Sequence, residues 1–200
     1  IPVSGFTDKN IVMGLVGKIS TTTNLSASFE EEYKLNSEIN FKTRGFYNDT
    51  SSTIVNSGPL PPVVGEETTY TVHWQLSNGL NDLENAIVSA SLPVGITWVG
   101  NSTSNQGNLY YDSNENEVAW EIPRVPAHAG SLLPTYEAVF QLRLSPVSSQ
   151  VGRLVPILGE SIFSARDEFS ENTLTSRGGS IRTDLEDDPT VSRNQGIIKQ

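Results

Sequence analysis

Apolar and polar residues alternate over many short stretches of this chain, which is the pattern of half-buried β-strands. The clearest stretch covers residues 70–76, where Tyr70, Val72, Trp74 and Leu76 alternate with threonine, histidine and glutamine. Helical periodicity is weak, because the best helical segment, Phe29–Leu35, is short and acidic. Further strands are predicted at residues 86–92, 118–122 and 138–144, with shorter ones at Ile96–Gly100 and Leu109–Asp112.

Turn-forming residues separate these stretches and set the expected fold. Asp112–Asn116 is expected to be a hairpin tip, because Asp and Asn side chains favour tight turns. About seven to nine strands, with turns every 8 to 12 residues or so, predict an all-β, immunoglobulin-like sandwich. Its expected core is Tyr70, Val72, Trp74, Val88, Leu92, Trp98, Trp120, Phe140, Leu142 and Ile162.

Residues 1–50 require a separate interpretation. They are expected to form a β-hairpin of Ile11–Ser20 with Ile39–Phe46, and Glu30–Glu32 are expected at a solvated tip. An internal repeat aligns Phe29–Thr43 with Phe169–Thr183 without a gap. The repeat divides the chain into a terminal hairpin of a preceding module or donated strands (1–50), a complete sandwich module (51–188) and the start of a linker (189–200).

Six short segments of the chain resemble one protein family. They are Asn56–Pro62, Val64–Val72, Leu92–Trp98, Glu117–Trp120, Gln150–Gly152 and Asp187–Pro189. They are similar to conserved repeat modules of unknown function, found in bacterial cell-surface proteins that often come from uncultivated phyla. The resemblance implies an immunoglobulin-like fold, a surface location and a role in display, adhesion or assembly, and it transfers no active-site residue.

Composition and charge exclude several classes of function. The chain has 13 basic and 23 acidic residues and a net charge of −10, whereas phosphate binding needs clustered Lys and Arg, so no nucleic acid partner is expected. It has no cysteine, which excludes disulfides and catalytic thiols. The apolar stretch Asn10–Gly17 is far shorter than the roughly 20 residues of a spanning helix, so no membrane insertion is expected.

The sequence contains no recognisable catalytic motif. It has two histidines, His73 and His128, and both are interpreted as isolated surface residues. No Gly-x-Ser-x-Gly elbow and no phosphate-binding glycine loop occur. We therefore expect no enzyme, no catalytic residue and no bound cofactor.

Calcium is the one metal worth considering, because it binds several carboxylate and carbonyl oxygens from loops. One candidate set lies in a predicted turn and the other at the end of the module, and the simpler interpretations are a plain hairpin turn and a solvated acidic linker. The candidates are Asp112, Asn114 and Asn116 in the turn, and Asp184, Glu186, Asp187 and Asp188 at the module end.

These observations favour a non-enzymatic structural module of a bacterial cell-surface protein or extracellular filament. Its expected partners are neighbouring copies or modules of the same protein, joined head-to-tail through residues 1–50, where the hairpin would add strands to an open sheet edge. The alternative is an adhesin-type module that binds glycan or another cell surface through its end loops. Those loops are Gly79–Asn85, Asn101–Asn108 and Arg124–Leu133.

Overall fold

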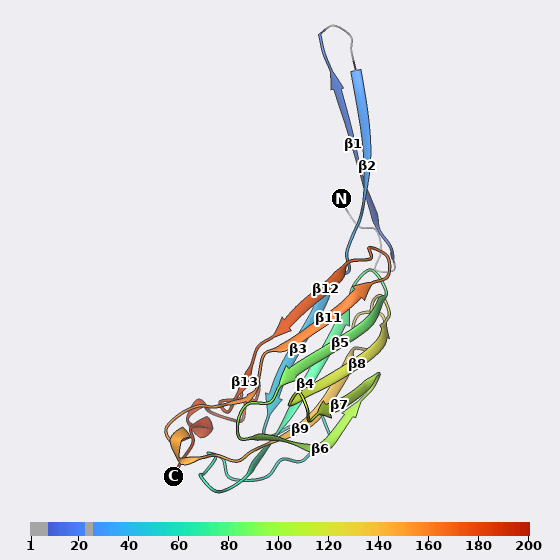
Figure 1. The fold of residues 1–200 in the computed structure, drawn as a ribbon. Helices are drawn as coiled ribbons and strands as arrows, with labels where there is room; N and C mark the ends of the chain where they lie inside the picture. The colour runs from blue at the N-terminus through green and yellow to red at the C-terminus, as the bar shows by residue number, and fades with distance from the viewer. Residues whose placement is uncertain (1–7, 23–25) are drawn as a thin grey trace.

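Antiparallel strands form most of the chain in the computed structural model, which describes residues 8–22 and 26–200 (Figure 1). One sheet has the order β3 (Ile39–Phe46), β4 (Thr68–Asn78), β9 (Tyr136–Leu144) and β6 (Ile96–Ser104). The other has the order β12 (Thr173–Gly178), β11 (Ser161–Asp167), β5 (Leu83–Ser91), β8 (Glu117–Val125) and β7 (Asn108–Asp112). The predicted all-β sandwich is confirmed.

Smaller elements flank the two sheets. A two-stranded sheet of β1 (Val12–Ser20) and β2 (Ser26–Lys34) projects from one end of the sandwich (Figure 1). A second two-stranded sheet, β10 (Pro156–Leu158) and β13 (Ile181–Arg182), lies toward the other end. The described residues contain two short 3₁₀ segments, Ser148–Gln150 and Arg193–Gly196.

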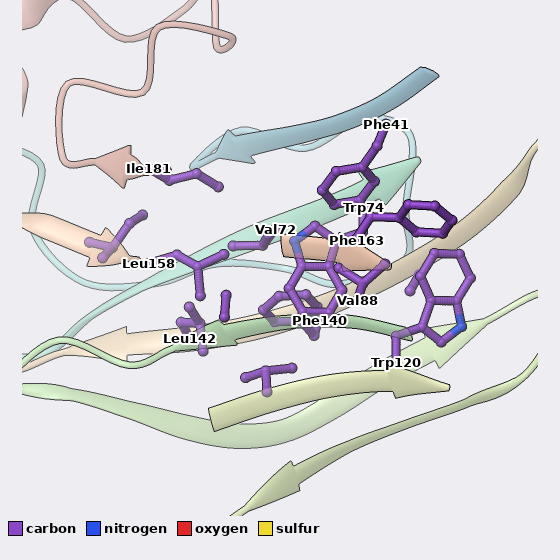
Figure 2. Close-up of a cluster of buried hydrophobic side chains, with 14 of the residues drawn as sticks. Phe41, Val72, Trp74, Val88, Trp120, Phe140, Leu142, Leu158, Phe163 and Ile181 are labelled. Atoms are coloured by element: carbon purple, nitrogen blue, oxygen red, sulfur yellow. The ribbon is translucent and has the colours of Figure 1, made fainter. Parts of the chain in front are cut away.

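Inward-facing side chains of both sheets meet in one hydrophobic core (Figure 2). Trp74 lies edge-on against Phe140, with ring centroids 4.8 Å apart, and its indole N–H donates to Ser161 Oγ at 3.0 Å. The indole N–H of Trp120 donates to the carbonyl of Gln106 at 2.8 Å. Both tryptophans therefore bury a large apolar area and also satisfy their one polar group.

Most of the predicted core is buried, with two differences. Trp98 is partly buried and stacks on Tyr111, with centroids 6.3 Å apart. The prediction for Ile162 is wrong, because its side chain is 41% exposed. Ile162 and Phe163 are adjacent in β11, so only one can face inward, and Phe163 is fully buried.

The predicted pairing within residues 1–50 is also wrong. The partner of β1 is β2, in a register from Val12↔Lys34 to Ser20↔Ser26, so Glu30–Glu32 lie within a strand and not at a tip. β3 belongs to the sandwich and pairs with β4 from Ile39↔Asn78 to Phe46↔Thr71. Phe41, in the middle of β3, is buried in the core because this pairing turns it inward.

The expected linker after residue 188 is likewise wrong for the described chain. Val191 and Ile198 are buried, and the Lys199 N–H donates to the Pro62 carbonyl at 2.8 Å. The two aligned repeat segments also differ in structure, because the first spans β2 and β3 whereas the second spans a turn, β12 and β13. The alignment therefore does not correspond to two copies of one hairpin.

The register of β11 leads to a testable prediction. Phe163→Ala is expected to lower the free energy of unfolding by about 3–5 kcal/mol, because it opens a large cavity in a dense core. Ile162→Ala, one residue away, is expected to lower it by about 0.5 kcal/mol or less, because that side chain already contacts water. Urea unfolding of both variants measures the difference, and equal losses would contradict the register.

Candidate functional site

The most unusual surface of the described chain is the hairpin formed by β1 and β2. It extends beyond the end of the sandwich (Figure 1). Every residue of β2 is exposed, and in β1 only Gly17 is even partly buried. An isolated two-stranded ribbon is marginally stable in water, so a hairpin of nine-residue strands without a covering layer requires an explanation.

The hairpin has one apolar face and one polar face. Directly paired residues of antiparallel strands project on the same side, so the register assigns each side chain to a face. The apolar face consists of Met13, Leu15, Gly17, Ile19, Ala27, Phe29, Glu31 and Tyr33. The polar face consists of Val12, Gly14, Val16, Lys18, Ser20, Ser26, Ser28, Glu30, Glu32 and Lys34.

Large side chains of the apolar face remain in water. Their exposed fractions range from 43% for Met13 to 65% for Ile19. Phe29 lies across its partner Gly17, and a Cβ atom at position 17 would collide with the Phe29 ring. The glycine therefore lets the aromatic ring lie flat over both strands, which keeps this face continuous.

Specific polar contacts attach the base of the hairpin to the sandwich, next to the start of β1 and at the end of β2. On the β1 side, Lys9 Nζ lies 2.8 Å from Asp82 Oδ1, and the Asn10 N–H donates to Asn81 Oδ1 at 3.2 Å. On the β2 side, Lys34 Nζ donates to the Phe169 carbonyl at 2.9 Å and also lies over the Phe169 ring. The hairpin is therefore held at two points and not by a single flexible link.

A buried polar cluster, which we call the hairpin base, lies beneath these contacts and comprises Ser37, Asn78, Asn81 and Asp167. Asp167 Oδ2 accepts from the Ser37 N–H at 2.8 Å and from Asn81 Nδ2 at 2.8 Å. The same Asn81 amide donates to the Leu35 carbonyl at 2.8 Å, and Ser37 Oγ donates to Asn78 Oδ1 at 2.6 Å. This network joins the segment after β2 to the β4–β5 and β11–β12 connections.

Hydrogen bonds stabilise the charged form of Asp167. Burial acts to raise the pKa of its carboxyl, but the donors Asn81, Ser170, Ser37 and Phe169 outweigh burial and lower the pKa below its usual value. No local sequence pattern marks this cluster, since Asn81 and Asp167 are 86 residues apart. Sequence reasoning missed it for that reason.

Two of the three end loops considered for ligand binding, Gly79–Asn85 and Arg124–Leu133, contact the hairpin base and each other, whereas the first residues of Asn101–Asn108 belong to β6. Asn78 Nδ2 donates to the carbonyls of Asn81 and Pro126, at 2.7 and 3.0 Å. The His128 N–H donates to the Gly79 carbonyl at 2.7 Å, and Asn105 Nδ2 donates to the Thr135 carbonyl at 2.8 Å. Much of their hydrogen-bonding capacity is therefore used within the protein.

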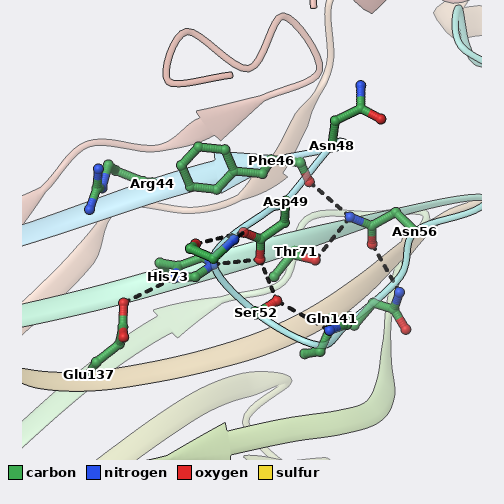
Figure 3. A network of polar contacts seen from close by, with 12 residues as sticks. Arg44, Phe46, Asn48, Asp49, Ser52, Asn56, Thr71, His73, Glu137 and Gln141 are labelled. Carbon is green, nitrogen blue, oxygen red and sulfur yellow. Dashed lines mark hydrogen bonds and ion pairs between the residues drawn. The ribbon is translucent and has the colours of Figure 1, made fainter. Parts of the chain in front are cut away.

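The prediction that His73 is a surface residue is wrong. The segment after β3 folds over the outer face of β4 and leaves the His73 side chain 2% exposed (Figure 3). Its Nε2 lies 2.7 Å from Asp49 Oδ2 and its Nδ1 lies 3.1 Å from Glu137 Oε1. Asn56 holds the same segment in place by donating to Thr71 Oγ1 at 2.9 Å.

This histidine is placed to hold a loop and not to exchange protons with a substrate. Both ring nitrogens face carboxylate oxygens, so neither is free to act as a general base. Burial acts to raise the pKa of Asp49, but hydrogen bonds from Ser52, His73 and Ser51 outweigh burial and hold the pKa well below its usual range. His128, the other histidine, is also not the surface residue that was predicted, because it is partly buried and its Nε2 atom is buried. It has a positive φ of 64° in the β8–β9 connection.

The calcium candidates do not form one oxygen-lined site. Within residues 8–22 and 26–200, no three acidic or histidine side chains are placed to hold a metal ion. Asp112 Oδ1 accepts from the Asn114 N–H at 2.8 Å, and Asn116 Nδ2 donates to the Leu92 carbonyl at 2.9 Å, as expected for a plain hairpin turn. Asp184, Glu186 and Asp187 line a shallow pocket of about 200 Å³ beside β13.

Asp188, the last calcium candidate, is buried and has a structural role. Its Oδ2 accepts from the N–H groups of Tyr47 and Asn48, at 2.9 and 2.8 Å. Its Oδ1 accepts from Thr190 Oγ1 at 2.6 Å. Burial opposes its ionisation, but these bonds lower the pKa of the carboxyl. Asp188 therefore fastens the chain after β3 to the C-terminal segment.

Comparisons with known proteins supply no family for this chain. No protein-family model and no curated protein matches the sequence. Among the described residues, no helix is long and apolar enough to cross a membrane.

Some solved structures match the fold at low similarity. The major pilin SpaD of Corynebacterium diphtheriae is 8% identical with a TM-score of 0.44, over 72% of this chain and 35% of SpaD. A variant of BcpA, the major pilin subunit of Bacillus cereus, is 8% identical with a TM-score of 0.43, over 84% of this chain and 47% of BcpA. A GH20 exo-β-N-acetylglucosaminidase variant from Vibrio harveyi is 7% identical with a TM-score of 0.34, over 72% of this chain and 17% of the enzyme. This chain spans less than half of each, and at these TM-scores the matches carry no argument about its function.

The hairpin base leads to a prediction about acid stability. Asp167→Asn is expected to lower the free energy of unfolding by about 1–3 kcal/mol at pH 7, because an amide cannot accept from all the donors that surround the carboxylate. The folded pKa of Asp167 lies below its unfolded value of about 3.9, so its contribution is present above that pH and is lost as the pH falls through the folded pKa.

The stability difference between the wild type and Asp167→Asn should therefore narrow as the pH falls from about 5 to about 2. Urea unfolding at a series of pH values measures it. Asp187→Asn, at an exposed position close to Asp188, is the control and should leave the pH dependence unchanged. A difference that stays constant across this range would mean that folding does not shift the pKa of Asp167.

Proposed function

We propose that this chain is a non-enzymatic structural module of a bacterial cell-surface protein or extracellular filament, and that the hairpin connects it to a neighbouring copy. The observation that carries the proposal is the uncovered apolar face of the hairpin. Continuous exposed apolar surface on a soluble protein marks an interaction site, because burying it removes apolar area from water.

The attachment of the hairpin supports a mechanical role. Contacts on both strands and a buried base fix the direction in which the hairpin points. A connector that is ordered before contact loses less conformational entropy on association than a flexible arm does. The surface location is inferred from the resemblance of Asn56–Pro62 and Leu92–Trp98 to bacterial surface modules.

A second candidate function is glycan binding, and a groove next to two of the end loops favours it. The groove has a volume of about 500 Å³ and lies between β5, β8 and the start of β7. Asn85, Asn108 and Glu121 could hydrogen-bond sugar hydroxyls there, beside the apolar Ile87 and Pro123. A glycan array tests it, since a purely structural module should bind no sugar.

Self-association of the intact chain tests the proposed function. Sedimentation and light scattering are expected to show a concentration-dependent assembly, because the exposed apolar face gains a partner as the concentration rises. A chain that is trimmed at residue 35 keeps β3 in the sandwich and is expected to remain monomeric. Circular dichroism should confirm that the trimmed chain is folded. An intact chain that stays monomeric up to millimolar concentration would contradict the proposal.

A further inference from the structure

We propose that the partner of the hairpin is the hairpin of a second copy, with the two apolar faces stacked and the two hairpins antiparallel about a twofold axis. This inference rests on the proposed function of the hairpin as an assembly element. It differs from the head-to-tail addition of strands to an open sheet edge that the sequence suggested, because it uses the face of the hairpin and not its edges.

The first argument is the surface that such a pair would bury. Met13, Leu15, Ile19, Phe29 and Tyr33 are each about half exposed. Side chains of this size contribute on the order of 100 Å² each when half exposed, so one face offers roughly 500 Å². Two stacked faces bury at most about 1,000 Å², which is the size of a weak or transient interface. Edge-on strand addition would leave this face in water.

The second argument is shape. In the antiparallel stack, the twofold axis lies between Leu15 and Gly17. β1 then lies over β1 of the second copy. Each cross-strand residue pair faces the residue pair that lies at the same distance on the other side of the axis. The bulky Tyr33 then faces Ala27 of the second copy, and Leu15 faces Gly17. Sheets pack about 10 Å apart when large side chains meet small ones in this way. A parallel stack would place β1 over β2 at the same level, so the bulky Met13–Tyr33 pair would face itself.

The third argument is charge. Each chain has a net charge of −10, and the antiparallel arrangement places the two sandwiches at opposite ends of the stacked hairpins. Nine residues of overlap separate them by about 30 Å, which is several Debye lengths at physiological salt. Glu30 and Glu32 lie on the outward polar faces. Glu31, the one charged group on the apolar face, lies opposite Phe29 of the second copy in this stack, and its position on β2 at the side of the hairpin lets its carboxylate extend past the ring into water.

Substitutions at two adjacent residues test whether the apolar face of the hairpin forms the dimer interface. Leu15→Asp places a charge inside the proposed interface and is expected to raise the dimer dissociation constant about 100-fold or more. Val16→Asp makes a similar change on the polar face. In the single chain Val16 is 71% exposed, whereas Leu15 is 51% exposed. It is expected to leave the dissociation constant within about threefold. Sedimentation equilibrium measures both, and matching circular dichroism spectra show that the two variants remain folded.

A distance measurement tests the direction of stacking. The chain has no cysteine, so Glu171→Cys in the exposed β11–β12 connection gives a single spin-label site near the hairpin base. The antiparallel dimer is expected to give a label separation above about 30 Å by pulsed electron paramagnetic resonance. Any shorter separation would indicate a parallel pair and would overturn the proposed arrangement.

The outcomes separate this inference from the proposed function. If the intact chain assembles but Leu15→Asp weakens assembly no more than Val16→Asp does, the stacked faces are wrong and the hairpin acts through its edges or another surface. If the intact chain does not assemble at any concentration, both the inference and the proposed assembly role fail.

Discussion

The carboxylate of Asp167 is the interaction on which the placement of the hairpin depends. It is fully buried, and its oxygens accept from backbone and amide donors of three different segments. An unpaired charge at this depth would be strongly unfavourable, so the donors and the acceptor have to be present together. Because Ser37 is one of the donors, the chain leaving β2 can enter β3 in only one way. The segment between the hairpin and the sandwich is thereby attached to the buried carboxylate.

A similar arrangement recurs at two other places in the molecule. Asp188 accepts from Tyr47 and Asn48, and Asp49 accepts from Ser52 and faces His73. In each case a buried carboxylate fastens a long connection to the sheet, at a position where backbone groups lack strand partners. A protein without disulfides can order long loops in this way, because each charged acceptor satisfies several donors at once.

The strands with clear alternation could be predicted from sequence, because a buried inner face and a solvated outer face leave a period of two. The stretches containing Val88 and Trp120 are of this kind. In the stretches containing Trp74 and Phe140 the outward positions are also largely buried, and the alternation is visible there because most of those positions are polar. β2 was missed since the consecutive glutamates 30–32 hide the alternation of Ala27, Phe29 and Tyr33. Ile162 was assigned inward because two large apolar residues stand side by side there. Local pattern alone cannot decide which of them the core accepts.

Side chains that act across long sequence separations could not be predicted. His73 stands among polar residues, and only the loop that folds over β4 makes it a buried residue. The hairpin base joins residues from positions 37, 78, 81 and 167, none of which belongs to a local motif. What a sequence pattern does predict well is the face that a strand turns to its own core. It does not predict which distant polar group will be its neighbour.

The direct continuation of β2 into β3 has a mechanical consequence. β3 begins five residues after β2 ends, and all eight of its residues pair with β4 in antiparallel register. Tension applied along the hairpin that passes the contacts of Lys34 and Ser37 reaches the first residue of β3, Ile39, through the chain. Force along β3 loads the whole β3–β4 ladder at once, in shear, and does not peel its hydrogen bonds apart one after another. The sheet would yield only when the ladder slides as a unit, which is the geometry suited to a component that transmits tension.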